Sequence, residues 1–505
     1  MKPITWMLMA ACLSLTACGG DDASTIGSAS SSGPSSPGGG GNAGGGNTGG
    51  NTGGGNTGGS TSQTQAGWSQ AVALDGKTLA FEPSTTIDGS GDTLVTWMTN
   101  GPSGAGGNEM WGARYVPGAG WSTATRLDTG DGTHPMTGPG TIQPQLVGNA
   151  AGQAVAFWTE WMPGPNMYAL WARPFSPGSG WGTPYEVAPD VTSSTYTAGI
   201  DGQGNALVAF PQSISLLDSR IAWVRYTPDG TWSPTTQIQM PVQTGPGAVT
   251  GDTTNLRPMI SVLSSGRAVL AWGQTNGTQS AIWTATYDAT NGWTNVNPAV
   301  TNTSLFTDID APTAGMDAKG NLTLVWGQID VANGKIMTTT MSQRYMAGTG
   351  WQTAKQVAPE ITEASGFIAK PMLAVSENGA AGVMWAEGGA VLKASVADTD
   401  GNWGPLQTLT EHLNSSAGQL PPIVIDGAGN VTAAWQDMGT SNSSDVIASS
   451  YRNGAWTATT FGQDPQSSSW PALAVNAAGS MALVWQNDNL NVGPQLQTSF
   501  YTPGH

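Results

Sequence analysis

The sequence contains only two cysteines, Cys12 and Cys18, and both lie near its start. No disulfide can form among the other residues, so the fold must be stabilised by packing. Histidine is also scarce, and His134, His412 and His505 do not stand at the spacing of metal ligands. We therefore expect neither a metal nor a cofactor. The 16 basic and 33 acidic residues argue against nucleic acid or an anionic membrane surface as a partner.

The first 18 residues resemble a bacterial lipoprotein signal. Lys2 gives a basic start, an apolar run follows, and Leu15-Thr16-Ala17-Cys18 has the form of a lipobox. The apolar run is too short to span a bilayer as a helix. The resemblance implies cleavage before Cys18 and acylation of its thiol, which would anchor the chain stably to a membrane. Gly19 after the cysteine implies, by the same resemblance, the outer membrane of the cell envelope.

Residues 19–66 are nearly all Gly, Asn, Thr and Ser. Such a segment has too little apolar surface to fold, so we expect a flexible tether that spans about 40 Å on average. The predicted parts are a signal over 1–18, a tether over 19–66 and a folded domain over 67–505.

The folded part is built from an internal repeat. Eight times a glycine is followed six positions later by an aromatic residue, and successive copies lie 50 to 62 residues apart. A fixed motif within a variable period indicates one supersecondary unit with loops of different length. The pairs, which define repeats 1 to 8, are Gly91/Trp97, Gly152/Trp158, Gly204/Phe210, Gly266/Trp272, Gly320/Trp326, Gly379/Trp385, Gly429/Trp435 and Gly479/Trp485. Eight positions before the glycine stands a proline in every repeat except the third, which has Tyr196.

Alternation of apolar residues on both sides of the glycine predicts a β-hairpin whose first strand opens at the proline. A third strand ends in a recurring aromatic residue, and a short turn leads to a tryptophan that opens a fourth strand. The third-strand aromatics are Tyr115, Phe175, Tyr226, Tyr287, Tyr345, Tyr451 and Phe500. Four-stranded units in series predict an all-β protein, an eight-bladed β-propeller.

The two ends of the folded part complement each other. Repeat 8 lacks its tryptophan and fourth strand, whereas residues 67–74 carry a spare copy with Trp68. We expect this N-terminal strand to complete the last blade beside Tyr501, which closes the ring and removes an open sheet edge.

The connections of each repeat fall into two classes. Those from strand one to two and from strand three to four are nearly constant, and we call their side of the domain the turn face. The connections from strand two to three and between repeats vary in length, and we call their side the loop face. Variable loops on a fixed scaffold usually carry function, so we expect the site on the loop face.

Two positions of every repeat lie on the loop face and are candidates for contact with a ligand. The position two residues after the strand-two aromatic is always polar: Thr99, Glu160, Gln212, Gln274, Gln328, Glu387, Asp437 and Asn487. This set is either a ligand-binding ring or, as we favour, a framework side chain that ties the next loop. The position before the proline varies instead, and includes Arg257, Lys370 and Trp470. The two basic residues are candidates to meet an anion.

Several aromatic residues of the loop face have no counterpart in other repeats: Trp161, Trp470, Tyr168, Phe306 and Phe367. Exposed aromatic rings on a mostly uncharged surface are suited to stacking on sugar rings. The alternative, which we weigh above it for any single residue, is a plug that packs over the blades.

The turns Tyr226-Thr227-Pro228-Asp229-Gly230-Thr231-Trp232 and Asp398-Thr399-Asp400-Gly401-Asn402-Trp403 resemble the Asp-box turns of sialidase-like propellers. That resemblance implies a propeller fold. Sialidases grip a carboxylate with a cluster of arginines, and here only Arg257 stands at the loop-face end of a first strand. Arg114, Arg173, Arg225 and Arg344 recur just before the third-strand aromatic and are interpreted as framework.

Two functions remain open. We favour a lipid-anchored binding or scaffolding propeller whose partner is a carbohydrate or an envelope protein. The alternative is a sialidase-like glycoside hydrolase with a carboxylate pair such as Glu160 and Glu387, which would require carboxyl groups within about 5 to 9.5 Å of each other.

Overall fold

In the computed structural model the described residues are 67–74, 80–100, 108–129, 144–162, 167–191, 195–215, 218–241, 257–275, 280–302, 307–332, 335–362, 370–414, 420–438, 443–462, 467–489 and 493–504. They belong to one compact unit, Ser62–His505. Their secondary-structure elements are β-strands paired in antiparallel sheets, so the predicted all-β class is confirmed. These ranges hold no helix with the length and apolar character that a bilayer crossing needs.

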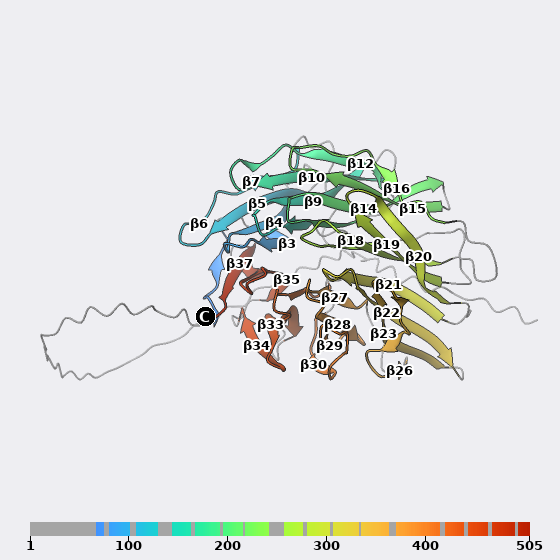
Figure 1. Ribbon diagram of the computed structural model, residues 1–505. Coiled ribbons are helices and arrows are strands. Elements are labelled where there is room, and N and C mark those ends of the chain that lie inside the picture. Colours follow the sequence, from blue (N-terminus) through green and yellow to red (C-terminus); the bar gives the residue numbers. More distant parts are fainter. Residues whose placement is uncertain are drawn as a thin grey trace, which may run out of the picture. The chain divides into compact units, whose positions relative to one another are not determined.

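Each of the first four repeats folds as an antiparallel meander, in which the short strands β6 and β7 both pair with β5, and β11 and β12 both pair with β10 (Figure 1). Repeat 1 holds β3 (Ala80–Ile87), β4 (Thr93–Asn100), β5 (Asn108–Val116), β6 (Gly120–Trp121) and β7 (Thr125–Arg126). Repeat 2 holds β8 (Gln145–Gly148), β9 (Ala154–Met162), β10 (Met167–Ser176), β11 (Gly180–Trp181) and β12 (Tyr185–Val191). Repeat 3 holds β13 (Thr197–Ile200), β14 (Ala206–Ser215), β15 (Asp218–Tyr226) and β16 (Thr236–Gln237). Repeat 4 holds β17 (Met259–Val262), β18 (Ala268–Thr275), β19 (Ser280–Asp288) and β20 (Gly292–Asn302).

The later repeats have the same order. Repeat 5 holds β21 (Thr307–Met316), β22 (Leu322–Ala332), β23 (Lys335–Met346), β24 (Gly350–Trp351), β25 (Lys355–Gln356) and β26 (Ile361–Thr362). Repeat 6 holds β27 (Met372–Val375), β28 (Ala381–Glu387), β29 (Val391–Ala397) and β30 (Gln407–Thr410). Repeat 7 holds β31 (Ile423–Ile425), β32 (Val431–Met438), β33 (Ser444–Arg452) and β34 (Ala455–Phe461). Repeat 8 holds β35 (Ser468–Val475), β36 (Met481–Asn489) and β37 (Gly493–Thr502).

The recurring glycine is required by the turn between strands one and two. All eight glycines have φ between 79° and 101°, a backbone conformation that side chains with a Cβ rarely adopt. In repeat 1 the amide of Gly91 donates to the carbonyl of Asp88, and Asp88 Oδ1 accepts from the amides of Ser90 and Asp92. A short side chain at the turn's first position thus caps the backbone that the glycine bends.

The recurring strand-two aromatics form the core between repeats. Each is at most 1% exposed, as the two-sided apolar pattern of this strand predicts. Neighbouring residues of one strand face opposite repeats: Trp158 packs with Met110 of repeat 1, and Phe157 packs with Phe210 of repeat 3. Each strand two is therefore buried on both faces, by the sheets of the preceding and the following repeat.

The proline does not always open its strand as predicted. β8 and β17 begin directly after Pro144 and Pro258, but β3, β21 and β35 start earlier and run through theirs. In these three strands the pairing register shifts at the proline, as at Phe81 to Ser84 in β3. A bulge accommodates a residue that has no amide hydrogen to donate to the ladder.

The first strands of consecutive repeats contact each other along the series, and β35 of repeat 8 contacts β3 of repeat 1. Figure 1 shows this meeting of the two ends of the described chain, with β37 in red beside β3 in blue. The strand one-to-two turns of repeats 8 and 1 also contact each other, because Asn476 Nδ2 donates a buried hydrogen bond of 2.9 Å to the carbonyl of Asp88.

The predicted pairing of the N-terminal strand is confirmed. β1 (Gly67–Trp68) and β2 (Val72–Ala73) both pair with β37, and Trp68 lies opposite Tyr501 with ring centroids 5.4 Å apart. The aromatic of repeat 8 that matches Tyr115 in register is therefore Tyr501, not Phe500 as predicted. Phe500 points to the other face, where its ring stacks on Tyr115 at 4.2 Å.

Candidate functional site

The acidic residues two positions after the strand-two tryptophan accept hydrogen bonds from its indole. Trp158 Nε1 donates to Glu160 at 3.0 Å, Trp385 Nε1 to Glu387 at 3.1 Å, and Trp435 Nε1 to Asp437 at 3.0 Å. Residues two apart in a strand share a face, which sets this geometry. The carboxylates are buried, with 1% to 9% of their surface exposed. They satisfy an indole that would otherwise be buried without a partner.

Two of these acidic residues make further contacts within the protein. Glu387 forms an ion pair of 2.9 Å with Lys393, and Asp437 accepts a hydrogen bond of 2.5 Å from Thr410 of the neighbouring repeat. Asp437 also faces Asp445 across the strand pair. Burial, and then the charge of Asp437, raise the pKa of Asp445 above its usual value.

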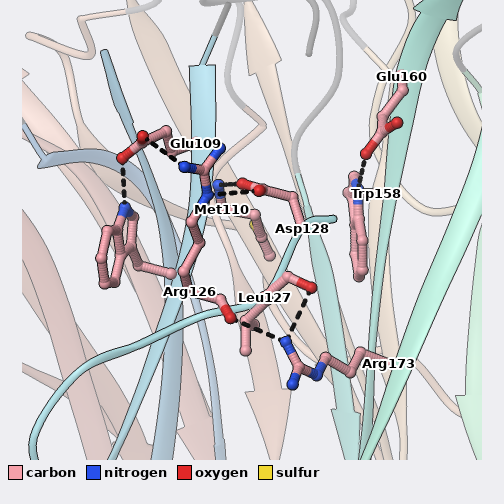
Figure 2. A network of polar contacts seen from close by, with 9 residues as sticks. Glu109, Met110, Arg126, Leu127, Asp128, Trp158, Glu160 and Arg173 are labelled. Atoms are coloured by element: carbon pink, nitrogen blue, oxygen red, sulfur yellow. Dashed lines mark hydrogen bonds and ion pairs between the residues drawn. The ribbon is translucent and has the colours of Figure 1, made fainter. Parts of the chain in front are cut away.

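Glu160 lies near an ionic network of repeat 1 (Figure 2). Arg126 contacts Glu109 at 2.9 Å and Asp128 at 2.6 Å. Asp128 also accepts from the amide of Met110 at 2.6 Å. Arg173 of repeat 2 joins the repeats, because its Nη1 donates to the carbonyls of Arg126 and Leu127 at 2.8 and 3.1 Å. Each carboxylate drawn in Figure 2 is thus held by a donor of the protein itself.

Trp161 and Tyr168 lie together, as their common place on the loop face predicts. They are opposite each other on β9 and β10, half-buried, with ring centroids 4.9 Å apart and an edge-to-face angle of 62°. Because side chains alternate along β9, Trp161 faces repeat 3 whereas Glu160 faces repeat 1. The structure therefore separates two residues that the sequence analysis placed in one site.

The aromatic pair continues into a polar row. Tyr168 pairs with Val191 of β12, and Val191 pairs with Gln212 of β14, a pair that joins the sheets of repeats 2 and 3. Gln212 donates to Asp190 at 3.4 Å and accepts from Gln237 at 3.3 Å. The candidate site is this row at the interface of two repeats, from the rings of Trp161 and Tyr168 to Gln212 and Asp190, and we call it the Trp161 platform.

The three candidates before the proline occupy different environments. Arg257 is exposed, and Lys370 lies half-buried with its Nζ 3.4 Å from the sulfur of Met259. Met259 follows Arg257 by two residues, so the two basic residues approach the same strand end. Trp470 lies in the bulge of β35 at a φ of 54°, in the left-handed region that residues other than glycine seldom adopt.

The arginines act as framework, with one correction of register. Arg114 pairs with Asp92 and donates to the carbonyl of Pro177 in repeat 2, and Arg344 donates to the carbonyl of Thr399 in repeat 6. Arg173 stands two residues before its aromatic rather than one, so it faces the preceding repeat. The position that matches Arg114 is Pro174.

A groove that the sequence analysis missed opens on the turn face, between repeats 2 and 3. It has a volume of about 620 Å³ and includes Tyr185, Tyr226, Asp229 and Trp232 among its lining residues. A signal for it exists in the sequence, because the fourth position after the strand-four tryptophan is Tyr185 here. In the other repeats this position holds Thr125, Thr236, Asn297, Lys355, Gln407, Thr460 and Val72.

Three earlier candidates, Cys18, Phe306 and Phe367, lie outside the described residues. Within the described ranges, no three or more His, Cys, Asp or Glu side chains gather in a group that could hold a metal ion.

No family model and no curated protein matches the chain. Among solved structures, the chain is similar to a polysaccharide lyase, with 12% identity, a TM-score of 0.45, and coverage of 83% of this chain and 89% of that chain. It is also similar to an ulvan lyase of polysaccharide lyase family PL25, with 10% identity, a TM-score of 0.44, and coverage of 85% and 95%. A protein of unknown function from Dyadobacter fermentans gives 9% identity, a TM-score of 0.40, and coverage of 86% and 98%. At these identities and scores, the likeness does not assign the chain to a family.

Proposed function

We propose that residues 67–505 form a closed eight-bladed β-propeller that binds a carbohydrate through the Trp161 platform. Three observations support the closed ring: the meander of each repeat, the contacts of first strands from β3 through to β35 and back to β3, and the pairing of β1 with β37. A propeller of four-stranded blades accounts for all three, because it buries both faces of every inner strand and leaves few open edges.

The observation that carries the carbohydrate proposal is the contact of Trp161 with Tyr168, which is linked through β12 to Gln212 and Asp190. A saccharide presents apolar C–H faces and polar edges, so it is bound by aromatic rings together with amide and carboxylate groups. Trp161 departs from the repeat, since other repeats place Asn100, Ser213, Thr275, Ile329, Gly388, Met438 and Asp488 at its position. A residue that the framework does not require is a candidate for ligand contact.

We assign Glu160 and Glu387 to the framework rather than to hydrolysis. Each accepts a hydrogen bond from the indole of its own strand, and Glu387 is also paired with Lys393. A hydrolytic acid has to reach the glycosidic oxygen, and these carboxylates are buried against tryptophan. Binding without cleavage is therefore the function that the contacts support best.

We expect Trp161→Ala to weaken carbohydrate binding about tenfold or more, because it removes the larger ring of the platform. A glycan array identifies the ligand, and titration calorimetry with that ligand measures the change. Met438→Ala is the matched control, since Met438 stands at the same position of repeat 7 and is 46% exposed. Equal binding by wild type and Trp161→Ala would contradict the platform. Cleavage products from the wild type that disappear in Glu160→Gln would instead favour the hydrolase.

We further propose that acylated Cys18 anchors the propeller to the cell envelope, at the outer membrane, through the tether of residues 19–66. The lipobox-like segment and the composition of the tether support this part of the proposal. In bacterial cells, Cys18→Ser is expected to prevent incorporation of labelled palmitate and to release the protein from the detergent-soluble membrane fraction. Palmitate incorporation equal to wild type would refute the assignment of this residue.

A further inference from the structure

The groove on the turn face lies between the strand three-to-four turns of repeats 2 and 3. One wall is formed by the segment from Pro174 to Tyr185 and the other by Tyr226, Asp229 and Trp232. The Trp161 platform stands at the opposite ends of the same strands, where the loop face lies. The groove volume of about 620 Å³ falls in the range of small-molecule sites.

Repeat 2 lacks an arginine that crosses the interface to the next repeat in repeats 1 and 5. In repeats 1, 3 and 5 the position before the third-strand aromatic is an arginine, and in repeat 2 it is Pro174. Arg114 and Arg344 extend across the interface to backbone carbonyls of the next repeat. The spaces lined by these two arginines have volumes of only about 10 and 30 Å³. Proline is too short to reach the next repeat as these arginines do, and Pro174 lines the groove between repeats 2 and 3.

A second departure from the repeat provides an aromatic surface. Tyr185 is 41% exposed and lines the groove, so its ring is accessible to a ligand. Its ring stacks on Trp232 with centroids 4.8 Å apart and planes 3° from parallel. Trp232 is supported in turn by Tyr226 at 4.8 Å and Phe157 at 6.4 Å. The two walls of the groove therefore meet in an aromatic stack, in which the Tyr185 ring is exposed.

The remaining lining residues are a mixture of apolar and polar residues and carry little charge. They include Gln153, Ser176, Ser179 and Thr183, with Asp229 as the one ionisable group besides the tyrosines. Asp229 accepts hydrogen bonds from the Thr227 hydroxyl and the Thr231 amide, and these bonds hold the pKa of its carboxyl below the usual value. A groove with an ionised carboxylate and no basic residue repels an anion.

From this geometry we propose that the groove is a second ligand site, on the face opposite the Trp161 platform, and that it binds an uncharged saccharide. The sugar ring stacks on Tyr185, and the hydroxyl, amide and carboxylate groups along the groove bind its hydroxyls. The open length between the two turns admits a chain of sugar units rather than a single buried ring.

The test uses soluble uncharged oligosaccharides of glucose, xylose, mannose and N-acetylglucosamine, observed by saturation-transfer NMR and tryptophan fluorescence. Tyr185→Thr introduces the residue that repeats 1 and 3 have at this position, and it is expected to weaken binding at least about tenfold. Pro174→Arg is expected to abolish binding at this site, because an arginine fills the matching space in repeats 1 and 5. Thr125→Tyr, in repeat 1, is the matched control without a groove.

The outcomes separate this site from the loop-face proposal. Loss of binding in Tyr185→Thr and Pro174→Arg but not in Trp161→Ala supports the groove, whereas the reverse pattern supports the platform and overturns the groove. Failure of every oligosaccharide to bind at Tyr185 also overturns it. So does preferential binding of tetramethylammonium, which would identify the groove as a cation site. Melting curves verify that the variants fold, and Tyr185→Thr alters an exposed side chain that the fold does not need.

Discussion

Replacing Trp68 by alanine will lower the free energy of unfolding by about 3 kcal/mol. Trp68 lies between Phe461, at 5.2 Å, and Tyr501, at 5.4 Å, beside the buried cluster that includes Trp485. The same position in other repeats holds a tryptophan that packs on the third-strand aromatic, as Trp456 packs on Tyr451 at 5.5 Å. Removal of the indole leaves a void that the closely packed surroundings fill only in part.

Urea denaturation of the full chain measures this effect, with Val72→Ala as the control. Val72 belongs to the same N-terminal segment and is 50% exposed, so its truncation should change the unfolding free energy by less than about 0.5 kcal/mol. Hydrogen exchange should also accelerate in β37, whose partner strand Trp68 anchors. A loss no greater than that of Val72→Ala would mean that the N-terminal strand does not secure the last repeat.

The framework of this fold follows from residues whose backbone or packing admits few alternatives. Gly91 and its seven equivalents are required by a turn with positive φ, and Trp97 and its equivalents fill the space between neighbouring sheets. Such positions recur at fixed spacing because every repeat makes the same turn and fills the same space between sheets. The pairing of Trp68 with Tyr501 was predictable for the same reason, since repeat 8 lacked one strand and the residues from 67 onward contained one.

The candidate site was predictable only in part, because it depends on which way single side chains point. The sequence predicted that Trp161, Tyr168 and Glu160 lie on the loop face, but not that the two rings contact each other while Glu160 faces the other repeat. The groove was missed because it lies beside a position where a recurring side chain is lacking. Pro174 stands where Arg114 and Arg344 cross the interface in other repeats. Spacing patterns reveal residues that recur and do not show the space left by one that is missing.

Tyr196, the one residue that breaks the proline rule, shows how a departure from the repeat can serve the framework instead. Its hydroxyl enters the end of the preceding hairpin, where it donates to the carbonyl of Phe157 at 2.8 Å and accepts from the amide of Gln145 at 3.2 Å. Gln145 and Phe157 are partners across β8 and β9, so the hydroxyl bridges their backbone groups. The side-chain amide of Gln145 also donates a hydrogen bond to the carbonyl of Tyr196 at 2.8 Å.

Tyr196→Phe is therefore expected to lower the free energy of unfolding by about 2 kcal/mol at pH 7, because two buried backbone groups lose their partner. Tyr115→Phe is the control, since the Tyr115 ring is half-buried and packs on Trp121 and Phe500 through its faces. Its effect should stay below about 0.5 kcal/mol. A Tyr196→Phe variant as stable as wild type would show that water replaces the hydroxyl.

The same pair of proteins should differ in their dependence on pH. Burial raises the pKa of the Tyr196 hydroxyl far above its ordinary value, and the charge of Glu82 adds to this effect. In the unfolded chain the hydroxyl ionises near pH 10, so the stability that the neutral form provides is complete below that pH. Above it the unfolded state gives up a proton that the folded state keeps, and wild type loses about 1.4 kcal/mol per pH unit through this residue. Phenylalanine has no such proton, so the stability difference of about 2 kcal/mol should shrink to well under 1 kcal/mol by about pH 11. Urea denaturation at pH 7, 10 and 11 measures it, and a difference that stays constant across this range would contradict the buried, neutral hydroxyl.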